Sequence, residues 1–274
     1  FHPFFFKRLW RPEINLRSHR KIVVIDGTIG FTGGINITDD ENEHIKKDAY
    51  IDLHFKIRGE IVRWLQLAFV ADWLYAGGKF AADTLYFPVP AETAGPIAAQ
   101  VLAAGPDTPF EPIHRAQVFA INSACKRVLL VTPYFVPSES AMMALTSAAL
   151  RGVDTALVVP LMSDNRLVTL AARSYFEDLT RAGVRVYEFP QMLHTKALLV
   201  DDATAILGSS NFDHRSFRLN FELSILFDNT VVAEQLSRVL YGYLGKSTRF
   251  NPKGKLPLSS RLAQAFARLF SPLL

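Results

Sequence analysis

The sequence holds a single cysteine, Cys125, among 274 residues. One cysteine excludes an intramolecular disulfide and argues against a thiolate-rich metal site, so we expect Cys125 to be a small buried residue. A strong charge of one sign is absent too, because 30 Lys and Arg against 26 Asp and Glu leave a net charge of +4. This excess suits an anionic substrate or surface but does not by itself indicate one.

Long hydrophobic runs are also absent. No uninterrupted apolar stretch approaches the roughly 20 residues that span a bilayer, and no secretory signal peptide is recognisable at the N-terminus. We therefore expect no transmembrane segment within this chain. The 49% of hydrophobic residues nevertheless supply a core for one large domain or two ordinary ones, which excludes disorder of the whole chain.

The sequence contains an internal repeat, around which the rest of the chain is arranged. A His-x-Lys-x4-Asp pattern occurs twice, at a shift of 175 residues (194 − 19). Its members are His19, Lys21 and Asp26 in the first copy, and His194, Lys196 and Asp201 in the second. The same shift places Gly33 on Gly208 and Asn36 on Asn211 without a gap. So many coincident residues of special chemistry indicate a duplicated structural unit.

The residues after the first copy predict a hairpin, a further strand and a helix. Residues 22–25 are β-branched, an Asp-Gly turn follows, and residues 29–32 return as a second strand. Residues 51–58 alternate apolar and polar side chains, as a half-exposed strand does. Residues 60–75 carry apolar side chains at helical spacing, and the proline-rich residues 83–112 then indicate a linker.

The second half alternates strands with helices. We predict helices over residues 113–125, 138–151 and 165–182, and strands over residues 127–132, 155–160, 185–189, 195–200 and 205–207. This alternation indicates an α/β fold in which mixed, mostly parallel sheets are flanked by helices. The duplicated motif further predicts two pseudo-repeated subdomains, with the active site at the interface of the two halves.

The predicted organisation has four segments. They are a first half (residues 1–82), a linker (83–112), a second half (113–258) and an amphipathic C-terminal helix (259–274). This helix either packs on the domain or lies on an anionic membrane. About 80 residues of strands and helices precede His194, but only 18 residues precede His19. We therefore expect the native protein to extend further in the N-terminal direction.

The repeated residues suit the binding of a phosphate better than the binding of a metal. A lysine ammonium beside an imidazole repels cations and cannot ligate them, so we expect no metal and no cofactor. The same ammonium can neutralise phosphoryl oxygens. On a strand, the His and Lys of each copy share one face and the Asp does not, so Asp26 and Asp201 are open to either a catalytic or a structural role.

Two half-sites brought face to face would hold two imidazoles and two ammonium groups in one pocket. One histidine can attack phosphorus while the other protonates the leaving alkoxide, because imidazole titrates near neutral pH. We expect substrate contacts from residues that offer donors or a close backbone approach, namely Asn36, Asn211, Gly33 and Ser209. Asp52 and Glu222, each about 30 residues after a histidine, are candidates to orient the imidazoles.

The doubled motif, with each copy followed by Gly-Gly or Gly-Ser and then Asn, resembles the phospholipase D superfamily. Flanking stretches narrow the resemblance to the bacterial cardiolipin synthases. They include residues 15–21 (NLRSHRK), 32–37 (TGGINI), 132–137 (TPYFVP), 211–217 (NFDHRSF), 220–222 (NFE) and 271–274 (SPLL). The resemblance covers essentially the whole chain.

The resemblance implies a reaction as well as a fold. His19 would attack the phosphodiester of phosphatidylglycerol, and His194 would protonate the departing glycerol. The hydroxyl of a second phosphatidylglycerol would then resolve the phosphatidyl-histidine intermediate, with His194 as base, to give cardiolipin. The near-symmetry of the sequence does not decide which histidine is the nucleophile. A membrane surface as partner and a bacterial inner-membrane location are implied as well.

Two further functions remain open at this point. Hydrolysis by water, as in a phospholipase D or a nuclease, would use the same residues. A nuclease would have a basic groove with stacking aromatics, and a net charge of +4 is thin support, so we expect no nucleic-acid partner. A binding protein with an inactive site is disfavoured, because both His-Lys pairs are intact.

Overall fold

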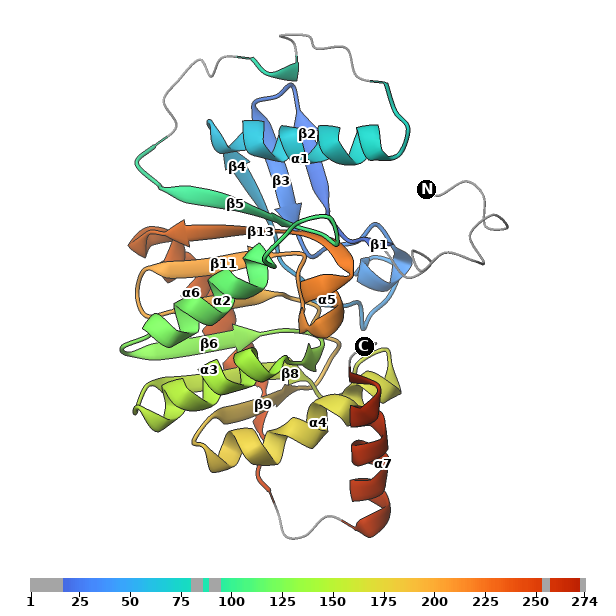
Figure 1. Cartoon of the computed structure of the whole chain (residues 1–274), viewed down its shortest axis with the longest axis vertical. Helices are drawn as coiled ribbons and strands as arrows, with labels where there is room; N and C mark the ends of the chain where they lie inside the picture. Colours follow the sequence, from blue (N-terminus) through green and yellow to red (C-terminus); the bar gives the residue numbers. More distant parts are fainter. Residues whose placement is uncertain (1–16, 80–85, 89–94, 253–256, 272–274) are drawn as a thin grey trace, which may run out of the picture.

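A computed structural model describes residues 17–79, 86–88, 95–252 and 257–271, and it shows a small part stacked on a large part (Figure 1). The small part, at the top of the view, comes from the first copy of the repeat. It contains a sheet in the order β2-β3-β4 with helix α1 lying across it. The large part is built around a nine-stranded sheet.

The small part follows the sequence pattern closely. Its elements are β2 (Ile22–Ile25), β3 (Ile29–Gly33), β4 (His54–Arg58) and α1 (Ile61–Tyr75), and the short strand β1 (Arg17–Ser18) precedes them in sequence. β2 and β3 form an antiparallel hairpin, and Asp26 and Gly27 at its turn have φ angles of 52° and 63°. Left-handed residues at a tight turn match the right-handed twist of the strands, which is why Asp-Gly predicts a hairpin here.

The large part contains the predicted alternation of strands and helices. Its elements are β5 (Ala99–Ala104), α2 (Pro112–Ser123), β6 (Arg127–Val131), β7 (Phe135–Val136), α3 (Glu139–Leu150), β8 (Asp154–Pro160), α4 (Arg166–Arg181), β9 (Arg185–Phe189), β10 (Ala197–Val200), β11 (Thr204–Gly208), β12 (Phe212–Asp213), α5 (His214–Arg218), β13 (Asn220–Asp228), α6 (Thr230–Lys246), β14 (Thr248–Arg249) and α7 (Leu258–Leu269).

The large sheet has the strand order β1-β13-β11-β10-β6-β8-β9-β14, and β5 also pairs with β13. β6, β8 and β9 pair in parallel because helices α3 and α4 connect them, whereas the hairpin-linked β10 and β11 pair antiparallel. The predicted α/β class is therefore confirmed, with a mixed sheet. β1 precedes the small part in sequence, but it pairs in parallel with β13 of the large part.

Side chains of the central strands alternate between two cores. Leu130 and Leu198 face a layer formed with α2, α3 and α4, which lie on one face of the sheet in Figure 1. Their neighbours Leu129 and Leu199 face a second layer, which contains residues of α6 and Leu65 of α1. Because both faces are covered, these strands are continuous apolar runs. The second layer joins the small part to the large part.

Three expectations need correction. Residues 99–104, inside the predicted linker, form β5 and pair with β13, so this stretch is part of the sheet. The predicted strand at residues 51–58 begins only at His54, which leaves Asp52 outside β4. Cys125 is exposed, because it lies in the turn between α2 and β6. Across the described ranges, no helix combines the length and the apolar character needed to cross a membrane.

Candidate active site

The two His-x-Lys segments come just before a strand and do not lie in one. Residues 19–21 precede β2, and residues 194–196 precede β10. The expected alternation of strand faces is therefore not what holds each pair together. Instead, Lys21 Nζ donates to the His19 carbonyl at 2.8 Å, and Lys196 Nζ donates likewise to the His194 carbonyl. This bond turns each lysine back beside its own histidine.

Backbone pairing carries each histidine to the other half of the repeat. The His19 amide donates to the Phe221 carbonyl at 2.9 Å, and the His194 amide donates to the Ile51 carbonyl at 2.7 Å. Glu222 follows Phe221 and Asp52 follows Ile51 in the sequence, and these are the two predicted orienting acids. The first half therefore supplies the acid beside the second histidine, and the second half supplies the acid beside the first.

His194 lies in the more enclosed half-site. Its Nδ1 is 2.6 Å from Asp52 Oδ2 and 3.4 Å from Glu41 Oε1, and its side chain is 11% exposed. Gly34 makes room for this contact, because a Cβ at that position would lie 2.3 Å from Asp52 Oδ1. The glycine after the first hairpin is thus required by the carboxylate that reaches across it.

His19 lies in the more open half-site, with a side chain that is 34% exposed. Its Nδ1 is 3.3 Å from Glu222 Oε1 and 3.4 Å from Asn220 Nδ2. Ser209 is fully buried and donates its hydroxyl to the other Glu222 oxygen at 2.5 Å. In this structure the Ser209 hydroxyl holds the acid that faces His19, so a contact of Ser209 with substrate stays a prediction.

Burial lowers the pKa of both motif lysines. It brings the pKa of Lys196 to about 8. The carboxylates of Asp52 and Glu41 raise this pKa, and the charge of Lys21 lowers it further. Burial also lowers the pKa of Lys21, against the attraction of Glu222 and Asp52. Each lysine responds to charged groups of the other half, Lys21 to Glu222 and Lys196 to Asp52 and Glu41. The two half-sites thus converge in one cluster of interacting charges.

Opposing effects set the pKa of His194. Burial lowers this pKa, and the charge of Lys196 does so as well. The carboxylates of Asp52 and Glu41 raise it, but burial outweighs them and holds the pKa of His194 below its usual value. A carboxylate beside Nδ1 also favours the tautomer that leaves Nε2 available to exchange a proton with a substrate. The geometry thus presents His194 as an acid or base whose proton affinity depends on two carboxylates.

Glu41, Asp52 and His194 bring three potential ligand atoms within 4.8 Å of one another. Lys196 Nζ, however, lies 3.4 Å from the same Asp52 oxygen that contacts His194. An ammonium at that distance repels a metal cation and already balances the carboxylate charge. The cluster is therefore better suited to hold protons than to hold a metal.

The two predicted amide donors, Asn36 and Asn211, are both engaged by other groups. Asn36 donates from Nδ2 and from its backbone amide to the two Glu41 oxygens, at 2.5 and 2.7 Å. Asn211 hydrogen-bonds to the Asp213 carboxylate, and its backbone amide donates to Ser216 Oγ at 3.2 Å. Contact of either amide with a phosphate needs these bonds to be exchanged, so that role stays a prediction.

Gly33, another predicted substrate contact, has a packing explanation. A Cβ on Gly33 would lie 2.3 Å from the Leu53 carbonyl oxygen, and its φ of 149° is one that favours glycine. Its repeat partner Gly208 would meet the Leu223 carbonyl oxygen at 2.2 Å. In both copies, glycine is needed because the neighbouring strand passes too close for a side chain.

The two motif aspartates differ in their contacts. The carboxylate of Asp201 accepts from the backbone amides of Cys125, Lys126 and Arg127, at 3.0, 2.7 and 2.9 Å. Burial raises the pKa of Asp201, but these hydrogen bonds outweigh burial and hold it below its usual value. Asp26 is exposed, and no hydrogen bond to its carboxylate occurs within the described ranges. The geometry favours a structural role for Asp201.

Sequence reasoning missed three residues around His194. Glu41 belongs to the acidic, polar stretch of residues 39–48, which has the composition of an ordinary surface loop, so nothing local points to it. The rings of Tyr50 and Tyr134 lie beside the imidazole, with centroids 6.0 and 6.3 Å away. Tyr134 is held by its hydroxyl, which donates to Asp164 at 2.7 Å. Its place in the TPYFVP stretch was the one available signal.

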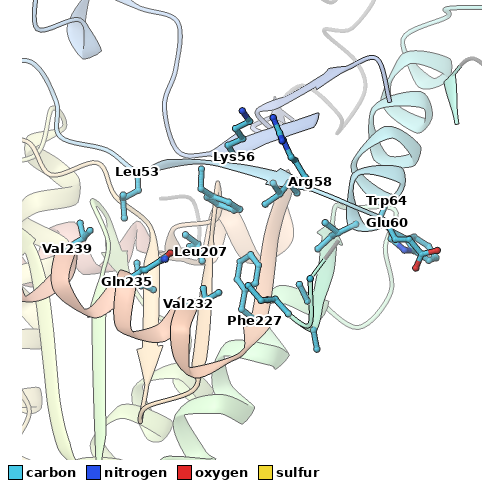
Figure 2. A pocket seen from close by; sticks show the side chains of 18 residues that line it. Leu53, Lys56, Arg58, Glu60, Trp64, Leu207, Phe227, Val232, Gln235 and Val239 are labelled. Atoms are coloured by element: carbon cyan, nitrogen blue, oxygen red, sulfur yellow. The ribbon is translucent and has the colours of Figure 1, made fainter. Parts of the chain in front are cut away.

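The larger of two hollows in the structure is not lined by the motif residues. A groove of about 1060 Å³ lies between β4, α1 and α6, with apolar residues such as Phe227 along it and Lys56 and Arg58 at its edge (Figure 2). Among its described lining residues there is no member of either motif. A smaller hollow of about 760 Å³ is lined in part by Glu41 and Asp52, and so adjoins the His194 half-site.

Comparison with known proteins agrees with the class that this fold and site define. Residues 118–242 match the sequence family described as "Cardiolipin synthase, PLD-like domain". The structure of phosphatidylserine synthase from Haemophilus influenzae Rd KW20 is 14% identical in sequence and superposes with a TM-score of 0.64, over 93% of this chain and 69% of that chain. At this identity the likeness shows the fold alone. The chain belongs to the phospholipase D superfamily.

Within that superfamily, the chain groups with the cardiolipin synthases. It is 41% identical over 269 residues to the cardiolipin synthase of Alkalihalophilus pseudofirmus, covering 95% of this chain and 53% of that protein. It is 36% identical over 281 residues to cardiolipin synthase A of Proteus mirabilis, covering 97% of this chain and 56% of that protein. The chain spans about half the length of the curated relatives it matches.

Proposed function

We propose that this protein is a phosphatidyltransferase that condenses two phosphatidylglycerol molecules into cardiolipin and glycerol. The proposal rests on the observation that each half of the repeat supplies the acid beside the histidine of the other half. Asp52 of the first half lies beside His194, and Glu222 of the second half lies beside His19. This exchange supports one site with two imidazoles, each with its Nδ1 occupied and its Nε2 available. The names of the relatives at 41% and 36% identity support the choice of lipid.

In the first step, His19 Nε2 donates its lone pair to the phosphorus of phosphatidylglycerol and forms a P–N bond. The bond between phosphorus and the glycerol headgroup oxygen breaks, and His194 gives its Nε2 proton to that oxygen. Lys21 and Lys196 offset the negative charge on the phosphoryl oxygens. Glycerol leaves, and the phosphatidyl group stays on His19.

In the second step, His194 is neutral and accepts the proton from a hydroxyl of a second phosphatidylglycerol. The hydroxyl oxygen attacks phosphorus, the P–N bond breaks, and its electron pair returns to His19. Cardiolipin forms and both histidines regain their initial proton states, so atoms and charges balance. Water in place of the lipid alcohol would give phosphatidic acid by the same steps.

The assignment of His19 as nucleophile follows the family resemblance and is supported by the geometry. Two carboxylates within 3.4 Å of His194 Nδ1 raise the pKa of His194 against the stronger effect of burial, whereas His19 has one carboxylate at 3.3 Å. The acid must carry a proton when the reaction begins, and the nucleophile must be neutral. The greater exposure of His19 also suits attack on an incoming lipid.

The proposed substrate also determines the proposed location. Phosphatidylglycerol is an anionic membrane lipid, so we place the enzyme at the bacterial inner membrane, with the membrane surface as its partner and with no nucleic-acid partner. The cluster of Lys21 and Lys196 supports recognition of an anionic headgroup.

The direct test incubates the purified protein with phosphatidylglycerol and separates the lipids that form. We expect cardiolipin together with one equivalent of glycerol. Phosphatidic acid without cardiolipin would support the hydrolase alternative, and the absence of both products would contradict the proposal.

Substitution of the histidines tests their roles. His19→Ala and His194→Ala should each lower transfer by at least about a thousandfold, while His44→Ala, at an exposed position, should leave it unchanged. With substrate labelled at phosphorus, label should remain bound to the His194→Ala protein and not to the His19→Ala protein. The reverse pattern would exchange the two roles.

A further inference from the structure

The C-terminal helix α7 packs on the protein through its small residues. Ala267 is fully buried against α4, and Ser271 Oγ lies 3.1 Å from the hydroxyl of Tyr175. Arg268 lies over the Tyr175 ring at 4.4 Å and 3.9 Å from an Asp178 oxygen. These contacts fix the orientation of α7 around its own axis.

The large apolar residues of α7 point away from the protein. Leu258, Leu262, Phe266 and Leu269 are 60–77% exposed, and their spacing of four, four and three residues places them in one stripe along the helix. An amphipathic helix ordinarily turns its largest apolar side chains toward the core. Here that arrangement is inverted, so the stripe is available to another apolar phase.

The charges of the helix favour an anionic partner. Arg261 and Arg268 are the charged residues between positions 258 and 271, and no acidic residue occurs in that range. A basic helix with an exposed apolar stripe has the composition of a helix that lies in the interface of an anionic bilayer.

The supporting helix also connects α7 to the active site. α4 begins two residues after Asp164. Asp164 accepts a hydrogen bond from the hydroxyl of Tyr134, and the Tyr134 ring lies beside His194. In Figure 1, the C-terminal end of α7 is nearer to β1 than its N-terminal end is. Strand β1 leads directly into the first motif. Leu161 and Met162, in the loop before α4, are exposed apolar residues as well.

We propose that the stripe formed by Leu258, Leu262, Phe266 and Leu269 inserts into the interfacial layer of an anionic phospholipid bilayer and holds the active site at the lipid surface. The choice of a lipid surface rests on the proposed function, because a phosphatidyltransferase must meet its substrate there. The helix lies in the plane of the interface, with Arg261 directed toward the headgroups.

The test is vesicle flotation of the whole 274-residue chain with and without an altered stripe. The test variant is Leu262→Gln with Phe266→Gln, and the matched control is Phe119→Gln with Leu150→Gln, two positions on α2 and α3 that are each 74% exposed. On vesicles of phosphatidylglycerol and phosphatidylethanolamine, the test variant should bind about tenfold more weakly or worse. The control should bind as the unaltered protein does.

Two further measurements separate the possible outcomes. Arg261→Gln should weaken binding to phosphatidylglycerol vesicles and not to phosphatidylcholine vesicles, with the difference lost at high salt. Transfer from short-chain phosphatidylglycerol below its micelle concentration should be equal in the test variant and the unaltered protein. If no variant transfers phosphatidyl groups but the stripe still controls flotation, docking stands and the proposed function fails.

The inference is overturned if the test variant floats with vesicles as well as the unaltered protein does. It is also overturned if the unaltered protein fails to float and instead forms a dimer that the test variant loses in sedimentation velocity, because the stripe would then bind a second copy. Equal melting temperatures for the variants confirm that the exposed substitutions leave the fold intact.

Discussion

The two half-sites carry the same motif in different surroundings. His194 contacts Glu41 in addition to its orienting aspartate, whereas His19 has one carboxylate neighbour, Glu222, within the described residues. The repeat shift places Ser216 where the first copy has Glu41 (216 − 41 = 175). Glu41 accepts a hydrogen bond from the backbone amide of Asn36, and Ser216 accepts one from the backbone amide of Asn211. One residue outside the motif thus makes two repeated histidines chemically different.

The motif hairpins differ in the same way. β10 lies between β11 and β6, and Leu198 and Val200 on it are buried. In the described residues β2 pairs with β3 alone, and Val23 and Ile25 on it are exposed. The first hairpin therefore lacks a counterpart of β6 among the described elements.

Neutralising the two acids that lie beside the histidines should have the largest effect on the transfer rate. Asp52→Asn and Glu222→Gln should each lower the rate of phosphatidyl transfer about 10²- to 10⁴-fold, because a neutral amide no longer stabilises a protonated imidazole. Asp52→Asn should cost more, since Asp52 is closer to its histidine and also faces Lys196. The exposed Asp48→Asn is the control. Equal loss in all three variants would argue against orientation by these acids.

The two motif aspartates should differ in their effect on stability. Asp201→Asn should lower the free energy of unfolding by about 2 kcal/mol, because the carboxylate holds three amides at the start of β6. Asp26→Asn should change it by less than about 0.5 kcal/mol. Urea unfolding monitored by circular dichroism measures both.

The stabilisation from Asp201 should also depend on pH in a defined direction. The folded state lowers the pKa of this group, so its contribution is complete above the unfolded pKa and is lost as pH falls through the folded value. The difference between Asp201→Asn and the unaltered protein should therefore narrow in acid. A difference that grows in acid would contradict the hydrogen-bond assignment.

Removing Glu41 should make the two half-sites more alike. Glu41→Gln should lower transfer about fivefold to tenfold and move the alkaline limb of the rate to lower pH, because Glu41 raises the pKa of both His194 and Lys196. In the unaltered protein, Lys196 should lose its proton near pH 8, which sets an upper limit for that limb. Glu43→Gln, at an exposed position of the same loop, should leave the profile unchanged.

The smallest effect should come from Ser209. Ser209→Ala removes one hydrogen bond from Glu222 but leaves the contact with Asn220, so transfer should fall only a few-fold. Its repeat position in the first copy is Gly34, which makes no side-chain bond. A loss as large as that of Glu222→Gln would mean that Ser209 contacts the substrate after all, as the sequence first suggested.

Local patterns in the sequence predicted much of this architecture. The strand-helix alternation and the Asp-Gly hairpin depend on neighbours within a few positions, and they appear in the structure close to where they were expected. The failures have a common cause. β5, the late start of β4 and the role of Glu41 depend on contacts with segments far away in sequence, which no local periodicity records.

By itself, the sequence determined that the chain carries a duplicated His-x-Lys unit and an α/β fold, because repeat spacing and hydrophobic period are local properties. The tertiary structure decided which acid faces which histidine. That choice depends on strand pairing between residues about 200 positions apart, such as Ser18 with Phe221. It also decided that the two histidines differ, because burial and neighbouring charge arise only when distant segments pack together.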